Sequence, residues 1–354
     1  MSLQTKEYHY ETKAWSKFLP IIFLLVAVVG LLYVKWSPYY LKAFTAAAKH
    51  SIGKSIITGG AAAAPAPSVS AALSYMSTYF KAVWKAVVLG LLLGSLIQVL
   101  IPRSWIRKLF GGLGFGSTLA AGAAALPGMM CTCCAAPVTV GLKQRSASIN
   151  ASIAFFLANP VLNPATIIFM GFVLSWKFAI FRVVMGLIMV FGIAALAGRF
   201  KDQEFDADGV SPSWEDSDES GNLFIRWRKA LWRLIVDTVP AYLIFVALLG
   251  AFRAWLFPVI GSGLSDGLLA IIILAVTGTL FVIPTAAEIP IVQSLMTLGL
   301  GVGPAATLLV TLPAVSLPSL LIVKRAFPTK VLVFVAGSVA LFGIAAGIIA
   351  SAVL

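Results

Sequence analysis

Long apolar stretches alternate with short polar or basic segments along almost the whole chain. About 18 apolar residues are enough for a helix to cross the hydrocarbon core of a membrane. We therefore predict an all-α, polytopic membrane protein with seven spans and two apolar helical hairpins. The predicted spans are 18–34, 73–101, 148–176, 178–198, 230–256, 303–323 and 331–353, and the predicted hairpins are 111–142 and 264–298.

Proline interrupts two of these spans. The run Asn159-Pro160-Val161-Leu162-Asn163-Pro164 lies inside 148–176, and Pro313 and Pro318 lie inside 303–323. Proline lacks a backbone donor, clashes with the preceding turn, and moves its neighbour out of the α region. A broken helix in a membrane is tolerated only where protein or a watery cavity satisfies the freed backbone groups. Many transporters build their substrate site in this way.

The two interrupted spans belong to a long internal repeat. Pro290 follows Pro137 by 153 positions (290 − 137), and Pro313 follows Pro160 by the same 153 (313 − 160). A repeat of this period in an apolar chain indicates a two-fold transporter and not a solenoid, whose unit is shorter. We divide the chain into an N-terminal tail, anchor helix and extracytoplasmic linker (1–72), a first transport repeat (73–198), a cytoplasmic acidic linker (199–228) and a second transport repeat (229–354).

Composition and charge set the class and the orientation. The chain is 60% hydrophobic with a mean hydropathy of +0.98 and a net charge of +13. Its basic residues are scattered over short segments, which is typical of positive-inside anchoring and not of nucleic-acid binding. Placing these segments in the cytoplasm puts the N-terminus there too and makes the two repeats inverted. The segments are the N-terminal tail, 102–110, 143–145, 199–229 and 324–330.

All three cysteines, Cys131, Cys133 and Cys134, lie within four positions beside Pro137. Such residues can be small packing groups, but thiolates are also ligands for soft substrates or metals. Zinc usually takes four ligands, and both histidines lie far away in the sequence, so we expect no metal site. A disulfide framework is also excluded by this clustering. We therefore interpret the cysteines as substrate contacts.

The other candidate residues are polar groups in apolar surroundings. Asn159 and Asn163 could cap the half-helices or contact substrate. Glu288 and Asp237 are acids in predicted membrane segments, where an acid commonly serves an ion or proton path, and either could instead pair with a cation. The weaker candidates for substrate contact are Gln293 and Thr311.

The run Leu126-Pro127-Gly128-Met129-Met130-Cys131-Thr132-Cys133-Cys134-Ala135-Ala136-Pro137, followed by the two Asn-Pro pairs, closely resembles the YraQ-like permeases. These belong to a permease family that also includes organoarsenical exporters of the ArsP type. The resemblance covers most of the chain, including Trp36-Ser37-Pro38-Tyr39-Tyr40, and Cys134 is an extra cysteine beside the Cys-x-Cys pair. It implies an inner-membrane permease with two related halves, and for the arsenical branch an involvement of cysteine in export.

Two functions remain open on these grounds. The first is a secondary transporter for a small soft or thiol-reactive solute, since the chain has no nucleotide-binding phosphate loop. The second is a transmembrane thiol-disulfide oxidoreductase, although a relay is expected to carry thiols in both halves and the second half has none. We favour transport, with no enzyme activity and no cofactor. The expected partners are a small-molecule substrate and membrane lipid, without nucleic acid, and a homodimer is left open.

Overall fold

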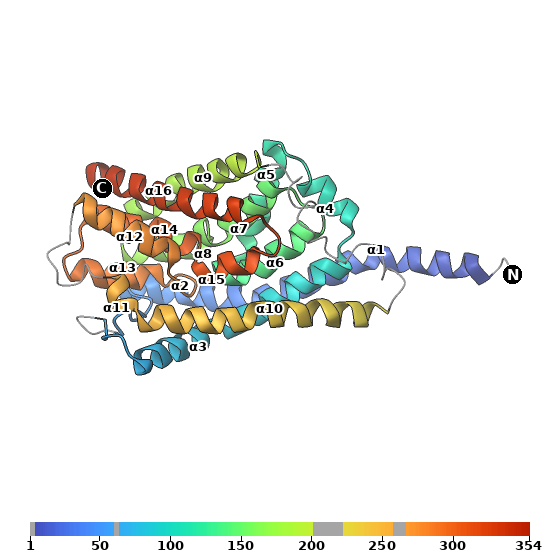
Figure 1. Cartoon of the computed structure of the whole chain (residues 1–354), viewed down its shortest axis with the longest axis horizontal. Helices are drawn as coiled ribbons and strands as arrows, with labels where there is room; N and C mark the ends of the chain where they lie inside the picture. The colour runs from blue at the N-terminus through green and yellow to red at the C-terminus, as the bar shows by residue number, and fades with distance from the viewer. Residues whose placement is uncertain (1–3, 60–63, 201–221, 258–266) are drawn as a thin grey trace.

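A computed structural model describes residues 4–59, 64–200, 222–257 and 267–354, and these residues form helices joined by turns, with no strand among them (Figure 1). In chain order the elements are α1 (Gln4–Leu31), η1 (Leu32–Trp36), α2 (Ser37–Lys49), α3 (Val69–Leu100), α4 (Arg103–Phe110), α5 (Phe115–Ala125), η2 (Leu126–Gly128), α6 (Thr132–Gln144), α7 (Ile149–Val161), α8 (Pro164–Val173), α9 (Trp176–Ala197), α10 (Leu223–Ala251), α11 (Arg253–Leu256), α12 (Leu268–Leu280), α13 (Glu288–Thr297), α14 (Val302–Ala314), α15 (Leu317–Val323) and α16 (Thr329–Val353).

The predicted all-α, polytopic class is confirmed. In the described part of the chain, seven helical segments are long and apolar enough to cross a membrane. They are Phe18–Lys49, Val69–Leu100, Ile149–Val173, Trp176–Ala197, Leu223–Ala251, Val302–Val323 and Thr329–Val353. Each corresponds to one predicted span, and the predicted hairpins lie between them.

The N-terminal span differs most from its predicted bounds. We expected it to end at residue 34, followed by a surface segment, but helical structure continues through η1, a turn of π-helix, into α2. Pro38 does not end the helix, because it directly follows η1, where the π-helical turn already interrupts the regular hydrogen-bond ladder. Helix α2 packs against α8 and ends at His50, which has a left-handed backbone (φ 47°). The first span is therefore longer than predicted, and its second part, α2, packs against the first repeat.

The two halves repeat the same order of elements. Each has a long helix (α3, α10), a short helix (α4, α11), a hairpin broken at its tip (α5/α6, α12/α13), a broken span (α7/α8, α14/α15) and a last long helix (α9, α16). Helices α5 and α6 lie toward the end of the molecule that holds the N-terminus, whereas α12 and α13 lie toward the other end (Figure 1). The two hairpins therefore start from opposite ends. An axis that inverts one half onto the other remains a prediction.

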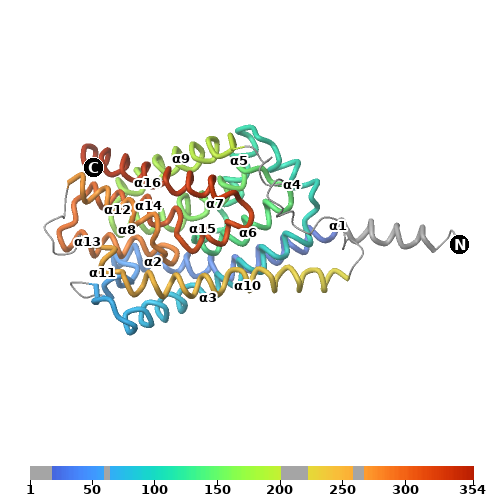
Figure 2. Tube along the Cα trace, viewed as in Figure 1, coloured from blue at the N-terminus to red at the C-terminus, as the bar shows by residue number. Residues whose placement is uncertain are grey.

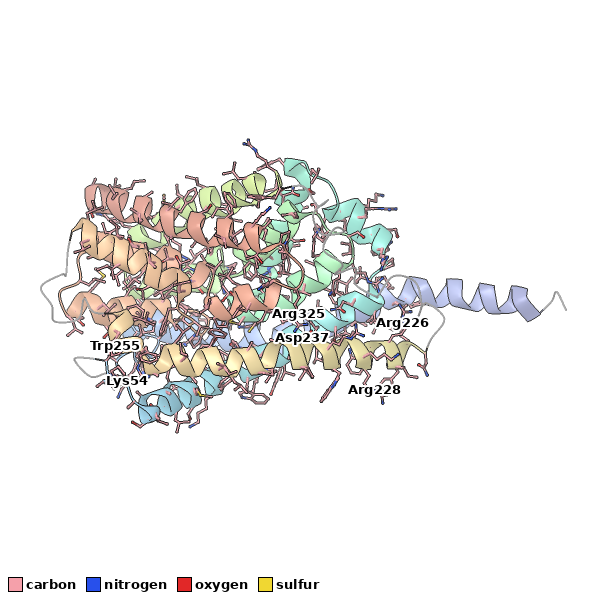
Figure 3. The ribbon with its side chains drawn as sticks, viewed as in Figure 1. Lys54, Arg226, Arg228, Asp237, Trp255 and Arg325 are labelled. Carbon is pink, nitrogen blue, oxygen red and sulfur yellow. The ribbon has the colours of Figure 1, made fainter. Side chains whose placement is uncertain are left out.

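Helix α1 enters the body at one end of the long axis, and the C-terminus lies at the other end (Figure 2). Arg226 and Arg228 lie at the N-terminal end with α4, and Lys54 lies at the other end (Figure 3). The basic segments around α4 and the start of α10 thus share one end of the molecule. Which side of the membrane this end faces stays a prediction.

Close packing of α3 on α6 places the cysteines in the centre of the body. A Cβ atom at Gly90 would lie 2.5 Å from the carbonyl oxygen of Cys134, and one at Gly94 would lie 2.6 Å from the carbonyl oxygen of Pro137. Only glycine permits the two backbones to approach this closely, as at many helix contacts in membranes. Helix α3 also packs along α10, its counterpart in the second half.

Candidate functional site

Four helix breaks, two from each half, meet at one small pocket. The breaks are the hairpin tips at 126–131 and 281–287 and the span interruptions at 162–163 and 315–316. The pocket has room for about one water molecule. Its lining is Cys131, Thr132, Pro160, Thr166, Ile283, Pro284, Thr285, Ala286, Glu288, Leu312 and Pro313. Residues far apart in the sequence therefore form one site at the points where the helices are interrupted.

Asn163 shapes the first interrupted span. Its side-chain oxygen accepts from the backbone N–H groups of Ala165 (3.1 Å) and Thr166 (3.3 Å), so it caps the N-terminus of α8. Its Nδ2 is buried and has no partner. Asn159 donates through Nδ2 to the Phe155 carbonyl (3.1 Å), and its Oδ1 is also buried without a partner. Both asparagines thus have a local structural role and one unused polar atom.

The second interrupted span contacts the cysteine hairpin. Ser316 caps α15 in a reciprocal arrangement with Ser319, whose hydroxyl accepts from the Ser316 N–H (3.0 Å). The Ser316 hydroxyl also lies 3.1 Å from that of Thr132, at the start of α6. A buried hydroxyl pair therefore joins the hairpin tip of the first half to the broken span of the second.

The three cysteines have different surroundings, although all are free and buried. Cys131 is the N-cap of α6 and reaches the pocket, and its Sγ lies 3.0 Å from the Sγ of Cys134. Cys131 and Thr285 both line the pocket. Cys133 points elsewhere, with its Sγ 3.7 Å from the Ser316 hydroxyl. Of the three predicted cysteine contacts, only Cys131 lines the pocket.

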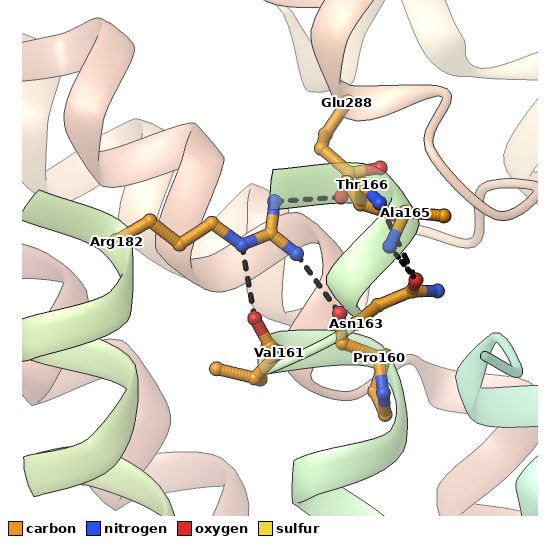
Figure 4. A network of polar contacts seen from close by, with 7 residues as sticks. All are labelled: Pro160, Val161, Asn163, Ala165, Thr166, Arg182 and Glu288. Carbon is orange, nitrogen blue, oxygen red and sulfur yellow. Dashed lines mark hydrogen bonds and ion pairs between the residues drawn. The ribbon is translucent and has the colours of Figure 1, made fainter. Parts of the chain in front are cut away.

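A buried ion pair joins the two halves on the other side of the pocket. Arg182 of α9 donates through Nη1 to Oε1 of Glu288 at 2.8 Å, and each residue is only 1% exposed (Figure 4). The same guanidinium donates through Nη2 to the Pro160 carbonyl (2.8 Å) and through Nε to the Val161 carbonyl (3.0 Å). These carbonyls lie at the C-terminal end of α7, where the break leaves acceptors free. The second oxygen of Glu288, Oε2, has no partner.

Comparison with known proteins agrees with this architecture. A sequence profile described as a predicted permease matches residues 119–352. The chain belongs to this predicted-permease family. It is 51% identical over 333 residues to UPF0718 protein YraQ of Escherichia coli (strain K12), with 94% of each chain covered. It is also 33% identical over 135 residues, or 36% of each chain, to UPF0718 protein MJ0584 of Methanocaldococcus jannaschii. No solved structure matches the chain. The expected resemblance to YraQ-like permeases is confirmed, and the protein is a multi-pass membrane permease.

The permease carries two buried cations beside the pocket that the sequence analysis did not single out. Arg182 is one, and the other is Lys35 of η1, which is 3% exposed. The Lys35 ammonium donates to the hydroxyls of Thr285 (3.1 Å) and Tyr39 (3.2 Å). The sequence feature that could have identified Lys35 and Arg182 is a charged residue in or beside an apolar span, since such residues are rare and commonly functional. We had placed Lys35 just outside its span, and Arg182 inside one without assigning it a role.

Of the nine predicted site residues, only Cys131 and Glu288 line the pocket. Cys133, Cys134, Asn159 and Asn163 lie near it, and the other three form bonds elsewhere. Asp237 forms an ion pair with Arg325 (2.9 Å) in which the Arg325 side chain is 59% exposed, the interfacial salt bridge that was the alternative to ion coupling. Gln293 donates to the backbone carbonyl of His50 at 2.9 Å. Thr311 donates to the Thr307 carbonyl within α14 at 2.8 Å. These contacts satisfy the three side chains locally and away from the pocket lining, and the structure does not test a role for them in transport.

Within the described ranges, no group of three or more His, Cys, Asp or Glu side chains is arranged to hold a metal ion. The cysteine cluster itself is divided between the pocket and the Ser316 side of α6. The chemistry of this site is therefore that of one pocket thiol, one buried ion pair and one buried ammonium.

Proposed function

We propose that this permease is a secondary transporter that moves a small soft or thiol-reactive solute through the pocket at the four helix breaks. The observation that carries the proposal is the convergence of both hairpin tips and both interrupted spans on one pocket lined by Cys131 and Glu288. Interrupted helices near the middle of a membrane expose backbone donors and acceptors to a bound substrate. A sulfur ligand in such surroundings favours a soft partner.

Two bridges across the halves give this site a means of alternating access. The hairpin of the first half is joined to the broken span of the second by Thr132 and Ser316. The hairpin of the second half is joined to the broken span of the first through Arg182 of α9, which binds Glu288 and the Pro160 and Val161 carbonyls at the end of α7. With both bridges formed, the pocket has room for about one water molecule. A larger solute can therefore enter only when one bridge opens. Each bridge holds a different hairpin, so opening one bridge releases one hairpin and leaves the other in place.

We assign the coupling role to Glu288. Protonation would remove its charge and weaken the bond to Arg182, because an ion pair at 2.8 Å depends on both charges. The second oxygen, Oε2, has no hydrogen-bond partner, and Glu288 lines the pocket, so a proton that reaches the site could bind there. Proton binding would thus release one hairpin, which is the element that must move. In this proposal the N-terminal end faces the cytoplasm of an inner membrane, in line with the positive-inside rule.

We do not favour an oxidoreductase relay, although the Sγ atoms of Cys131 and Cys134 lie 3.0 Å apart. All three cysteines of the chain belong to the first half. The second half places Glu288 at its hairpin, where a relay would need a thiol.

The test is transport by purified protein in liposomes, with phenylarsine oxide as a soft, thiol-reactive probe. We expect Cys131→Ser to lower the uptake rate at least about 10-fold, because a hydroxyl is a poor ligand for a soft centre. Glu288→Gln should lower the rate and remove most of its dependence on pH. Gln293→Ala is the matched control, since its side chain bonds outside the pocket, and it should transport normally. Normal transport by both the Cys131→Ser and Glu288→Gln proteins would show that the pocket is not the route.

A further inference from the structure

The Lys35 ammonium is buried without a carboxylate. It contacts two hydroxyl groups, those of Thr285 and Tyr39, and forms no ion pair in the part of the chain that the structure describes. An isolated buried charge is costly unless it is paired. Glu288 is the acid at this pocket, and it already binds Arg182. The charge of Lys35 is therefore left to be balanced by another group.

Cys131 is the acidic group that Lys35 can reach. The Thr285 hydroxyl accepts from the Lys35 ammonium at 3.1 Å, and Thr285 and Cys131 line the same pocket. Thr285 thus places the ammonium at the pocket that the thiol lines. Lys35 and Cys131 come from two segments, the N-terminal span and the first hairpin, that the sequence alone does not relate to each other.

The position of Cys131 favours a negative sulfur. Cys131 is the N-cap of α6, so the free N–H groups and the positive end of the helix dipole lie beside its side chain. The thiol form of Cys131 donates to the Sγ of Cys134 at 3.0 Å, and once Cys131 is ionised the Cys134 thiol would be the donor. Cysteines at helix N-termini near a lysine are typically ionised more readily than free cysteine.

A tether holds η1 against the cysteine hairpin. The Trp36 indole donates to the Pro127 carbonyl at 2.8 Å, directly at the hairpin tip. Turns of π-helix inside a longer helix are rare and frequently mark functional sites. Here η1 places Lys35 inward from a helix that precedes both repeats. Lys35 is therefore an addition to the site from outside the repeated halves.

We propose that Lys35 is the counter-ion that holds Cys131 as a thiolate, so that the transport site presents a preformed thiolate–ammonium pair. The Cys131 S–H bond breaks and its proton goes to water, while Lys35 keeps its own proton. The buried charges then balance as two pairs, Lys35 with Cys131 and Arg182 with Glu288. The role of this pair in transport rests on the proposed function, but its existence does not. A preformed thiolate suits an electron-poor, soft solute.

Several other titratable groups surround Cys131, and only one of them is cationic. They are Cys133, Cys134, Tyr39, Tyr79, Tyr242, Glu288 and Arg182. Arg182 is already bonded to Glu288 and to two carbonyls. Lys35 is thus the cation available to the thiol, and removing it should change the ionisation of Cys131 most.

The test measures the rate at which methyl methanethiosulfonate modifies Cys131 between pH 5 and 10, in protein carrying Cys133→Ser and Cys134→Ser. The serine hydroxyl that replaces the Cys134 thiol in this background can still donate a hydrogen bond to the remaining sulfur. With Lys35 present, we expect modification to stay fast at pH 7. Lys35→Met should lower the rate at pH 7 at least about 10-fold and move the midpoint toward the value of about 8.5 for free cysteine. Lys35→Arg keeps the charge and should keep the profile.

Lys42→Met is the control, because it removes a lysine from the next helix, α2, without touching the pocket. An unchanged profile in the Lys35→Met protein, or a midpoint near 8.5 with Lys35 present, would overturn the proposal. If Lys35→Met does not fold, Trp36→Phe loosens the same segment and should move the midpoint in the same direction, and no movement would count against us. Modification does not require transport. A shifted profile with normal uptake of phenylarsine oxide would therefore support the ion pair and refute the transport route.

Discussion

The Arg182–Glu288 bond offers the sharpest test of how the two halves are joined. Glu288→Gln keeps the size of the side chain and removes its charge, which leaves Arg182 buried and without a counter-ion. Breaking one partner of a buried pair typically costs about 3–5 kcal/mol. Arg182 retains its bonds to the Pro160 and Val161 carbonyls, at 2.8 and 3.0 Å, which keeps the loss within that range.

The expected size of the effect follows from the length of the chain. With an unfolding entropy of about 2.1 cal/mol/K per residue, 354 residues correspond to about 0.7 kcal/mol per degree. A loss of about 3–5 kcal/mol then lowers the midpoint of thermal unfolding by about 4–7 °C. The assay is thermal unfolding of the purified protein in detergent, followed by intrinsic fluorescence. Arg182→Gln should produce a loss at least as large, since two backbone carbonyls also lose their donor.

The matched control is Asp237→Asn. The Asp237–Arg325 pair has nearly the same length, 2.9 Å, but is partly exposed, with side-chain exposures of 23% and 59%. Exposed pairs contribute about 0–1 kcal/mol, so this change should lower the midpoint by no more than about 1 °C. The double variant Arg182→Gln/Glu288→Gln should be less destabilised than the sum of the two single changes, because no unpaired charge remains. Equal shifts for Glu288→Gln and Asp237→Asn, or strict additivity in the double variant, would refute the reasoning.

Two further predictions concern packing and orientation. Gly90→Ala should destabilise the protein by about 1–3 kcal/mol, because the added methyl group meets the backbone of α6 at 2.5 Å. Gly337→Ala is the control, because Gly337 has open space around it, and this change should not lower the unfolding midpoint. Equal midpoints for the two variants would contradict the close contact of α3 and α6. In a cysteine-free background, Lys54→Cys should react with an impermeant maleimide added to intact cells and Arg228→Cys should not, since both side chains are exposed and lie at opposite ends (Figure 3). Labelling of Arg228→Cys alone would reverse the predicted orientation.

The sequence determined the features that depend on local physics. Hydropathy located all seven spans, because crossing a membrane requires a minimum apolar length whatever the neighbours are. Proline positions located the interruptions, because the missing donor and the clash act within one turn. The repeat in these prolines predicted the shared order of elements in the two halves, which the structure has. Glu288 was singled out as an acid in an apolar segment, and Cys131 was singled out together with Cys133 and Cys134 because the three cluster beside Pro137.

The tertiary structure decided which of these residues meet. Lys35 contacts Thr285, 250 positions away, and Arg182 contacts Glu288, 106 positions away. Local rules do not specify such pairs, since they depend on how whole helices pack. The same packing separated Cys133 from the pocket and satisfied Gln293 elsewhere. A buried charge needs a partner and the sequence can show that need, but only the folded chain brings the partner within bonding distance.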